Sequence, residues 1–120
     1  AVQTVPRELT KQYGIVEVNG EHEKCPTIRS IVEKPDPQVA PSTMAVIGRY
    51  VLEPEIFDSL RKIDRGAGGE IQLTDAIARE IPKGKTVACK YDGERFDCGS
   101  KQGFLNATVH YARKEGYRII

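Results

Sequence analysis

The first twenty residues alternate between short apolar runs and turn residues, which predicts two strands joined by a helical turn. Residues 1–5 (A-V-Q-T-V) are typical of a strand. Residues 6–14 begin with proline and end with glycine, as a short helical turn does. A second strand is expected over residues 13–18 (Y-G-I-V-E-V), and it ends at the turn dipeptide Asn19-Gly20.

A third strand is predicted over residues 27–33, where β-branched residues are frequent (T-I-R-S-I-V-E). It follows a polar loop, so we expect it to pair with residues 13–18 as an antiparallel hairpin. Pro35 ends this run. It also biases Lys34 toward an extended backbone, because the proline ring disfavours the helical conformation of the residue before it.

A near-continuous apolar stretch over residues 44–52 (M-A-V-I-G-R-Y-V-L) predicts a fourth, buried strand. Pro54 then suits the first turn of a helix. The apolar residues expected on the inward face of that helix are Ile56, Phe57, Leu60 and Ile63.

The second half of the chain is expected to hold two more helices and a strand pair. One helix follows the glycine-rich residues 66–69, with an apolar side made by Leu73, Ala76, Ile77 and Ile81. Residues 86–91 and 95–98 are predicted to pair as strands about Asp92-Gly93. Ser100 suits the N-cap of the last helix, whose repeating positions are Phe104, Leu105, Thr108, Val109 and Ala112. Because strands and helices alternate, the predicted fold class is α/β with a mixed sheet.

Composition excludes several function classes. The 120 residues fit one domain, and 18 basic against 17 acidic residues give a net charge of +1. That balance gives no reason to expect nucleic acid or an anionic membrane as a partner, and no apolar run approaches the ~18 residues of a membrane helix. Three cysteines without C-x-x-C spacing indicate neither a disulfide framework nor a zinc site, and favour a reducing, cytoplasmic compartment.

Glu33 and Lys34 are the first candidates for chemistry, because they place a carboxylate and an ammonium at the end of a buried strand. Glu33 can accept hydrogen bonds from sugar hydroxyls, and Lys34 can act as a point charge on a phosphate. Side chains alternate across a strand, so both can meet one ligand only where the strand ends, which Pro35 supplies. The alternative is a solvated pair of charges at the strand end.

Asp97 is the second candidate, since it follows a predicted strand and precedes Gly99 and a helix start. Open α/β sheets bind ligands in the crevice at such strand ends. A carboxylate there can hold Mg²⁺, a hard ion that prefers oxygen ligands and accompanies substrate phosphates. The alternative is a turn aspartate or a helix cap. Cys98 is interpreted as a packing residue, because the sequence offers no base to activate it.

Residues 66–70 (G-A-G-G-E) precede a helix, and the exposed N–H groups of a helix start can bind anions. The run matches neither G-x-x-x-x-G-K-[ST] nor G-x-G-x-x-G, and Glu70 would repel a phosphate at close range. We therefore interpret it as a flexible loop near a ligand and not as a phosphate cradle.

Five segments, taken in order, resemble the carboxy-terminal half of the bacterial UTP–glucose-1-phosphate uridylyltransferases, or UDP-glucose pyrophosphorylases. They are V-E-K-P at 32–35, A-P-S at 40–42, V-I-G-R-Y-V-L at 46–52, G-A-G-G-E-I-Q-L-T-D-A-I at 66–77 and D-C-G at 97–99. The segment at 66–77 is specific to that enzyme, whereas E-K-P is shared with other sugar nucleotidyltransferases. The resemblance runs from Ala1 to about Lys114.

The resemblance implies a Rossmann-like nucleotide-diphospho-sugar transferase fold with a mixed sheet, present here only as its carboxy-terminal half, a single incomplete domain over residues 1–120. It also implies a Mg²⁺-dependent reaction in which glucose-1-phosphate attacks the α-phosphorus of UTP, giving UDP-glucose and pyrophosphate. The nucleophile is already anionic, so positioning and charge neutralisation carry the catalysis without a general base. For the full-length enzyme the resemblance implies a homo-oligomer.

By motif match, Glu33 falls on the family's glucose-hydroxyl ligand, and Lys34 falls on its phosphate contact, which makes Lys34 the expected catalytic residue. Gly48 falls where the backbone lies close to the sugar, and Asp97 falls on a Mg²⁺ ligand. The family's G-x-G-T-R nucleotide loop and its second metal aspartate have no counterpart in the sequence. The uridine and triphosphate site is therefore mostly missing, and the chain alone is expected to be inactive.

Two other functions stay open at this point. One is a related thymidylyl or cytidylyl transferase, because the choice of base lies largely in the part of the family that these motifs do not cover. The other is a non-catalytic module that binds a phosphosugar or serves in oligomer contacts. Motif resemblance alone separates the first of these from a uridylyltransferase.

Overall fold

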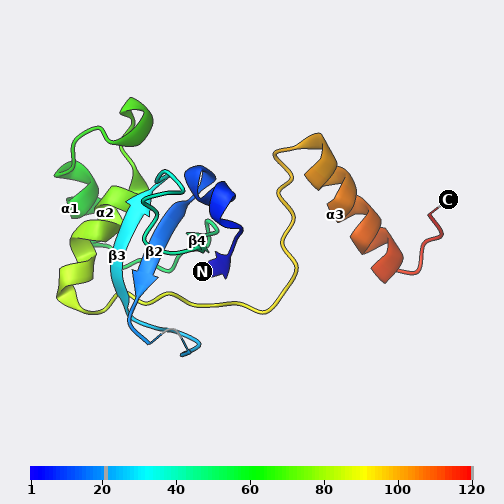
Figure 1. The fold of residues 1–120 in the computed structure, drawn as a ribbon, viewed down its shortest axis with the longest axis horizontal. Coiled ribbons are helices and arrows are strands. Elements are labelled where there is room, and N and C mark those ends of the chain that lie inside the picture. Colours follow the sequence, from blue (N-terminus) through cyan, green and yellow to red (C-terminus); the bar gives the residue numbers. More distant parts are fainter. Residues whose placement is uncertain (21, 120) are drawn as a thin grey trace.

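Four strands form one sheet in the order β1-β4-β2-β3 (Figure 1). The structure, a computed structural model, describes residues 1–20 and 22–119. The strands are β1 (Val2–Thr4), β2 (Gly14–Val18), β3 (Ile28–Glu33) and β4 (Met44–Val46), and neighbouring strands are antiparallel. One parallel contact is present, an isolated bridge between Val2 of β1 and Lys90.

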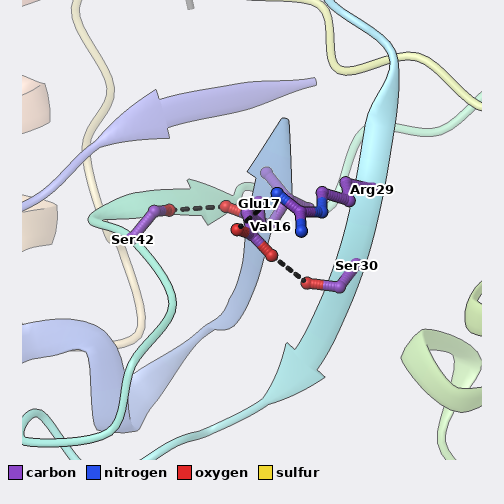
Figure 2. A network of polar contacts seen from close by, with 5 residues as sticks. All are labelled: Val16, Glu17, Arg29, Ser30 and Ser42. Atoms are coloured by element: carbon purple, nitrogen blue, oxygen red, sulfur yellow. Dashed lines mark hydrogen bonds and ion pairs between the residues drawn. The ribbon is translucent and has the colours of Figure 1, made fainter. Parts of the chain in front are cut away.

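β2 and β3 form the antiparallel hairpin that the sequence predicts, and polar side chains hold its register (Figure 2). Ser30 donates a 3.1 Å hydrogen bond to the carboxylate of Glu17 directly opposite, and Arg29 lies 3.5 Å from the same carboxylate. Ser42 donates to the backbone oxygen of Val16 and so ties the segment before β4 to β2. Since a slip of one residue would turn every side chain to the other face, these contacts help to fix which residues meet at the strand ends.

The predicted buried strand over residues 44–52 is wrong in its length, because β4 ends at Val46. Gly48 adopts a left-handed backbone with φ of 72°, and the chain turns out of the sheet there. The apolar residues beyond this turn are exposed: Tyr50, Val51 and Leu52. An apolar run does not by itself show where a strand stops, and a left-handed glycine stops this one.

Helices α1 (Ile56–Arg61) and α2 (Leu73–Glu80) pack on one face of the sheet (Figure 1). The buried residues they share with the strands are Val16, Ile28, Ile31, Ile56, Ala76 and Ile77. The predicted inward face is confirmed at Leu60, Ile63, Leu73 and Ile81, which pack against this cluster. It is wrong at Phe57, which is 61% exposed, because the short helix α1 turns that position away from the sheet.

The opposite face of the sheet is covered by a 3-10 helix, η1 (Arg7–Gln12), where the sequence predicts a helical turn. Leu9 packs there against Ile15 and Ala45. Ile15 and Val16 therefore serve different clusters, as the alternation of side chains along a strand requires. Shorter 3-10 turns occur at η2 (Ala67–Gly69) and η3 (Ile81–Lys83).

The predicted strand pair over residues 86–91 and 95–98 does not form. Residues 86–90 extend instead along the chain before β3, with an isolated antiparallel bridge between Thr27 and Val87. They also reach β1, because Val2 donates its N–H to the oxygen of Cys89 at 2.9 Å. The chain before β3 and strand β1, both distant in sequence, thus form the backbone hydrogen bonds that a local hairpin would have formed.

The last helix, α3 (Lys101–Lys114), begins where the sequence predicts, and Gly103 donates its N–H to the Ser100 side chain at 3.0 Å. An extended linker carries α3 away from the sheet (Figure 1), and no residue of α3 is buried. Its aromatic contacts are with the linker, where Phe96 lies 5.0 Å from the ring of His110. Across the described residues, no helix is long and apolar enough to cross a membrane.

Candidate functional site

A cavity of about 350 Å³ lies at the edge of the sheet where β2 begins and β3 and β4 end. Residues that line it and matter for its chemistry are Tyr13, Gly14, Glu33, Gly48, Thr74 and Arg95. It therefore brings together two residues predicted from the sequence, Glu33 and Gly48. The cavity lies at the carboxyl ends of β3 and β4, and β2 begins between them.

Glu33 is the last residue of β3, and its side chain is only 13% exposed. The Thr74 hydroxyl, in the first turn of α2, donates a 2.6 Å hydrogen bond to Glu33 Oε2. The other oxygen, Oε1, lies 3.9 Å from the ammonium of Lys34. One carboxylate oxygen is thus fixed by the Thr74 hydroxyl, and the other faces the Lys34 ammonium.

Gly14 makes room for this contact, because it lies directly opposite Glu33 in the β2–β3 ladder. A Cβ atom added at Gly14 would lie 3.1 Å from Glu33 Oε2 and 3.3 Å from the Thr74 hydroxyl oxygen. Such distances are tighter than ordinary carbon contacts, so a side chain at this position would push the helix and the carboxylate apart. The glycine therefore allows α2 to dock close to the end of β3.

Lys34 differs from its predicted backbone conformation: φ is 46°, in the left-handed region, and not extended. Its N–H donates to the Tyr13 oxygen at 2.9 Å, which continues the hairpin ladder by one residue before the chain turns. A left-handed conformation costs a non-glycine residue roughly 1–3 kcal/mol, and such residues are frequent at ligand sites. The side chain is half exposed and is not among the residues lining the cavity, although its ammonium faces Glu33.

Arg95 and Tyr13 form a second cationic feature that the sequence analysis did not select. Arg95 donates from Nη2 to the Tyr13 hydroxyl at 2.7 Å, and its guanidinium lies 5.2 Å from the centre of the Tyr13 ring. The ring and its hydroxyl hold the guanidinium at the cavity wall. Only the position of Arg95, two residues before Asp97, could have indicated it from the sequence.

Tyr50 also lines the cavity, and its environment depends on Glu33. Partial desolvation at the cavity raises the pKa of the Tyr50 hydroxyl, and the negative charge of Glu33 raises it further. The phenol therefore stays protonated, able to donate a hydrogen bond to a ligand. The sequence analysis assigned Tyr50 to a buried strand and therefore did not identify it as a residue of the site.

Gly48 lies at the cavity with its backbone exposed. A Cβ atom added there would meet nothing within 4 Å, so steric crowding by the protein does not require glycine. The left-handed φ of 72° does, since only glycine adopts it without strain. The result is a bare stretch of backbone facing the cavity.

Asp97 lies outside this cluster, on the exposed linker before α3, and is not among the residues lining the cavity. Its Oδ1 accepts a 3.0 Å hydrogen bond from the N–H of Gly99. The structure thus joins Glu33, Lys34 and Gly48 in one place and leaves Asp97 two residues beyond Arg95. Among the described residues there is no group of three or more His, Cys, Asp or Glu side chains that could hold a metal ion.

The glycine-rich loop closes on itself beside α2. The N–H of Gly66 donates to the Glu70 oxygen at 2.8 Å, and Arg65 donates to the Gly69 oxygen at 3.0 Å. Gln72 donates to the Ala67 oxygen at 2.8 Å. These bonds form a compact turn at the start of the helix that carries Thr74, so the loop supports the cavity indirectly.

The chain is similar in sequence to known nucleotidyl transferases. Residues 1–114 match the family described as nucleotidyl transferase. The chain is 44% identical over 108 residues to UTP–glucose-1-phosphate uridylyltransferase of Pseudomonas aeruginosa, covering 90% of this chain and 39% of that protein. It is 52% identical over 101 residues to the protein of the same name from Komagataeibacter xylinus, covering 84% of this chain and 36% of that protein.

Two solved structures have the same fold. A UDP-glucose pyrophosphorylase complexed with UDP-glucose superposes with a TM-score of 0.88 at 37% identity, covering 94% of this chain and 43% of that chain. A UTP-bound enzyme from Acinetobacter baumannii gives 0.77 at 42% identity, covering 94% and 39%. The chain thus spans about two fifths of the length of these relatives. The α/β fold and the resemblance read from the sequence are confirmed, and the chain belongs to the nucleotidyl transferase family.

Proposed function

We propose that this chain is the sugar-phosphate-binding part of a UTP–glucose-1-phosphate uridylyltransferase, which makes UDP-glucose and pyrophosphate from UTP and glucose-1-phosphate. The observation that carries the proposal is the cavity at the end of β3, where Thr74 holds Glu33 beside Lys34. A relative of the same fold is complexed with UDP-glucose. Residues 1–120 then form a single incomplete domain.

The cavity has the chemistry that a sugar phosphate needs. In our proposal the oxygen of Glu33 that faces Lys34 accepts hydrogen bonds from sugar hydroxyls, because a fixed carboxylate is a strong acceptor. Gly48 offers bare backbone against which the sugar ring lies. Lys34 contacts the phosphate as the catalytic residue, and Arg95, held by Tyr13 at the cavity wall, adds a second positive charge.

The reaction requires that the two substrates be held in position and that the negative charge of their phosphates be neutralised. An oxygen of glucose-1-phosphate attacks the α-phosphorus of UTP in line with the bond to the leaving pyrophosphate, and it is anionic beforehand, so no residue has to remove a proton. Lys34 lowers the repulsion between the two phosphates that must approach each other. Glu33 holds the sugar so that its phosphate points toward the nucleotide.

Asp97 is the residue of this chain that would hold Mg²⁺. Its carboxylate is a hard oxygen donor and is exposed, and Oδ2 has no hydrogen-bond partner within the described part of the chain. A single carboxylate fits this ion, which keeps several waters and takes substrate phosphates as its other ligands. When bound, Mg²⁺ supplies charge stabilisation to the phosphates. The Gly99 N–H fixes the orientation in which Asp97 presents its free oxygen.

The remaining features of the proposal follow from its substrates. UTP and sugar phosphates are cytoplasmic metabolites, so in our proposal the protein works in the cytoplasm. A homo-oligomer of the full-length enzyme is part of the proposal because the family resemblance implies it. A thymidylyl or cytidylyl transferase would use the same sugar-phosphate contacts and differ in its nucleotide. The chain alone supplies neither the nucleotide loop nor the second metal aspartate. In our proposal it therefore binds the sugar end of UDP-glucose but does not catalyse the reaction.

Calorimetry with UDP-glucose in the presence of Mg²⁺ tests the site. We expect Glu33→Gln to weaken binding by roughly tenfold or more, since it removes a charged acceptor at the sugar. Glu8→Gln, a change at an exposed glutamate of η1, is the matched control and should bind like the unmodified chain. Equal affinity of Glu33→Gln would overturn the site and favour a non-catalytic interaction module. Release of pyrophosphate by the isolated chain would overturn its expected inactivity.

A further inference from the structure

Residues 86–90 run antiparallel to residues 24–28, beside the start of β3. The N–H of Ala88 donates to the Pro26 oxygen at 2.8 Å, and the N–H of Lys90 donates to the Lys24 oxygen at 3.0 Å. The N–H of Ile28 donates to the Thr86 oxygen at 2.9 Å. These bonds follow one register, in which Thr27 pairs with Val87.

The same register places Cys25 directly opposite Cys89. The flanking residues make the backbone hydrogen bonds, so the two cysteines occupy a non-hydrogen-bonded pair of the ladder. In such pairs the Cα atoms are about 4.5 Å apart, within the span that a disulfide needs. Both thiols are free and exposed in the structure, so reagents reach them.

The two thiols also interact. The nearby Cys89 side chain raises the pKa of the Cys25 thiol, and partial desolvation and the charge of Cys89 add to the effect, while Lys24 opposes it. The third cysteine, Cys98, lies on the linker to α3, beyond this ladder. Two of three cysteines, which lie far apart in the sequence, are thus brought together by tertiary structure alone.

We infer that Cys25 and Cys89 are an oxidative modification site, which closes to a reversible intrachain disulfide in reaction with a small-molecule disulfide. One protein thiolate attacks a sulfur of the oxidant and forms a mixed disulfide, releasing one small thiolate. The other protein thiolate attacks the protein sulfur of that mixed disulfide, forming the Cys25–Cys89 bond and releasing the second small thiolate. The two sulfhydryl protons pass to the released thiolates, so the protein is oxidised and the oxidant is reduced to two thiols.

The bond would fix a segment that now depends on backbone hydrogen bonds. Residues 86–90 connect the helices on the sheet to the linker that bears Arg95 and Asp97. A bond from Cys89 to the chain before β3 anchors the start of that linker, and excess reduced thiol releases it again. Disulfides in reducing compartments are usually transient, as this reversible bond would be.

Incubation of the chain with oxidised and reduced glutathione, followed by alkylation and peptide mass spectrometry, tests the inference. We expect two of the three thiols to be lost, a cross-linked peptide joining Cys25 to Cys89, and no disulfide-linked dimer on a non-reducing gel. The oxidised protein should melt higher by about 5 °C or more, because the bond closes a long loop of the unfolded chain.

Single replacements provide the controls. Cys98→Ser should form the bond as the unmodified chain does, whereas Cys25→Ser and Cys89→Ser should each take up only glutathione adducts that reductant removes. Circular dichroism confirms that each variant is folded. Separate glutathione adducts on Cys25 and Cys89 without a cross-link, disulfide-linked dimers, or a cross-link to Cys98 would each overturn the inference.

Discussion

Thr74 donates a 2.6 Å hydrogen bond to Glu33, which joins the first turn of α2 to the last residue of β3. Thr74 is buried, and Glu33 is nearly so. The contact therefore fixes one rotamer of the carboxylate before any ligand arrives. Thr74 thus influences how a sugar is bound without touching it, because it sets the orientation of the Glu33 carboxylate that accepts the sugar's hydrogen bonds.

Replacing Thr74 by valine removes the hydroxyl at constant shape. A hydrogen bond to a charged group contributes about 1.5–3 kcal/mol, so we expect UDP-glucose binding to weaken roughly tenfold or more as Glu33 loses its orientation. Calorimetry measures the change. Thr74→Ser keeps the hydroxyl and is the control, with affinity close to that of the unmodified chain. Equal weakening by serine and valine would show that packing, and not the hydrogen bond, is what matters.

Lys34 combines a strained backbone with a functional side chain, so replacing it should separate stability from binding. Lys34→Gly relieves the left-handed conformation, and we expect the free energy of unfolding to rise by about 0.5–1 kcal/mol relative to Lys34→Ala. Both variants should bind glucose-1-phosphate more weakly than the unmodified chain. Urea unfolding and calorimetry provide the two measurements. If alanine were as stable as glycine, the backbone would carry no strain at this position.

The proposed role of Asp97 predicts a specific dependence on Mg²⁺. Removal of the ion with a chelator should weaken binding of UDP-glucose roughly tenfold, a change of ~1.4 kcal/mol. In Asp97→Asn the chelator should make little further difference, because the ligand for the ion is already impaired. Asp92→Asn changes an exposed aspartate of the same linker and serves as the control. A full response to chelator in Asp97→Asn would rule out this carboxylate as the ligand.

Glu80 links α2 to its surroundings, and its contacts predict a pH dependence of stability. Hydrogen bonds from Lys83 and from Ser59 of α1 lower the pKa of the Glu80 carboxyl below its ordinary value of 4.5. A lowered pKa in the folded state stabilises the protein above pH 4.5, and this contribution is lost as the pH falls through the lowered pKa.

Thermal unfolding between pH 7 and pH 3 measures that effect. The melting temperature of Glu80→Gln should fall less steeply below pH 4.5 than that of the unmodified chain. Glu8→Gln, which alters an exposed glutamate of η1, should follow the unmodified chain. Parallel curves for Glu80→Gln and the unmodified chain would mean that other carboxylates cause the acid instability.

Local sequence patterns were sufficient to predict most of the helices, strands and turns. The turn at residues 19–20, the β2–β3 hairpin, the serine cap of α3 and the apolar side of α2 each depend on neighbours within a few residues. The elements that differed depend on remote partners. β4 is shorter because Gly48 turns the chain, and residues 86–90 pair with the chain before β3 and with β1.

Short motifs in the sequence contain Glu33, Lys34 and Gly48, which lie at the candidate site, and Asp97, which lies outside it. Thr74 and Arg95 were not predicted as site residues, since their roles depend on docking of α2 beside Gly14 and on the Tyr13 side chain. The sequence by itself determined the family, the hairpin and the chemistry available at the strand end. Tertiary structure alone decided which of those groups meet, and which cysteines face each other, because strand register and helix docking join residues far apart in the chain.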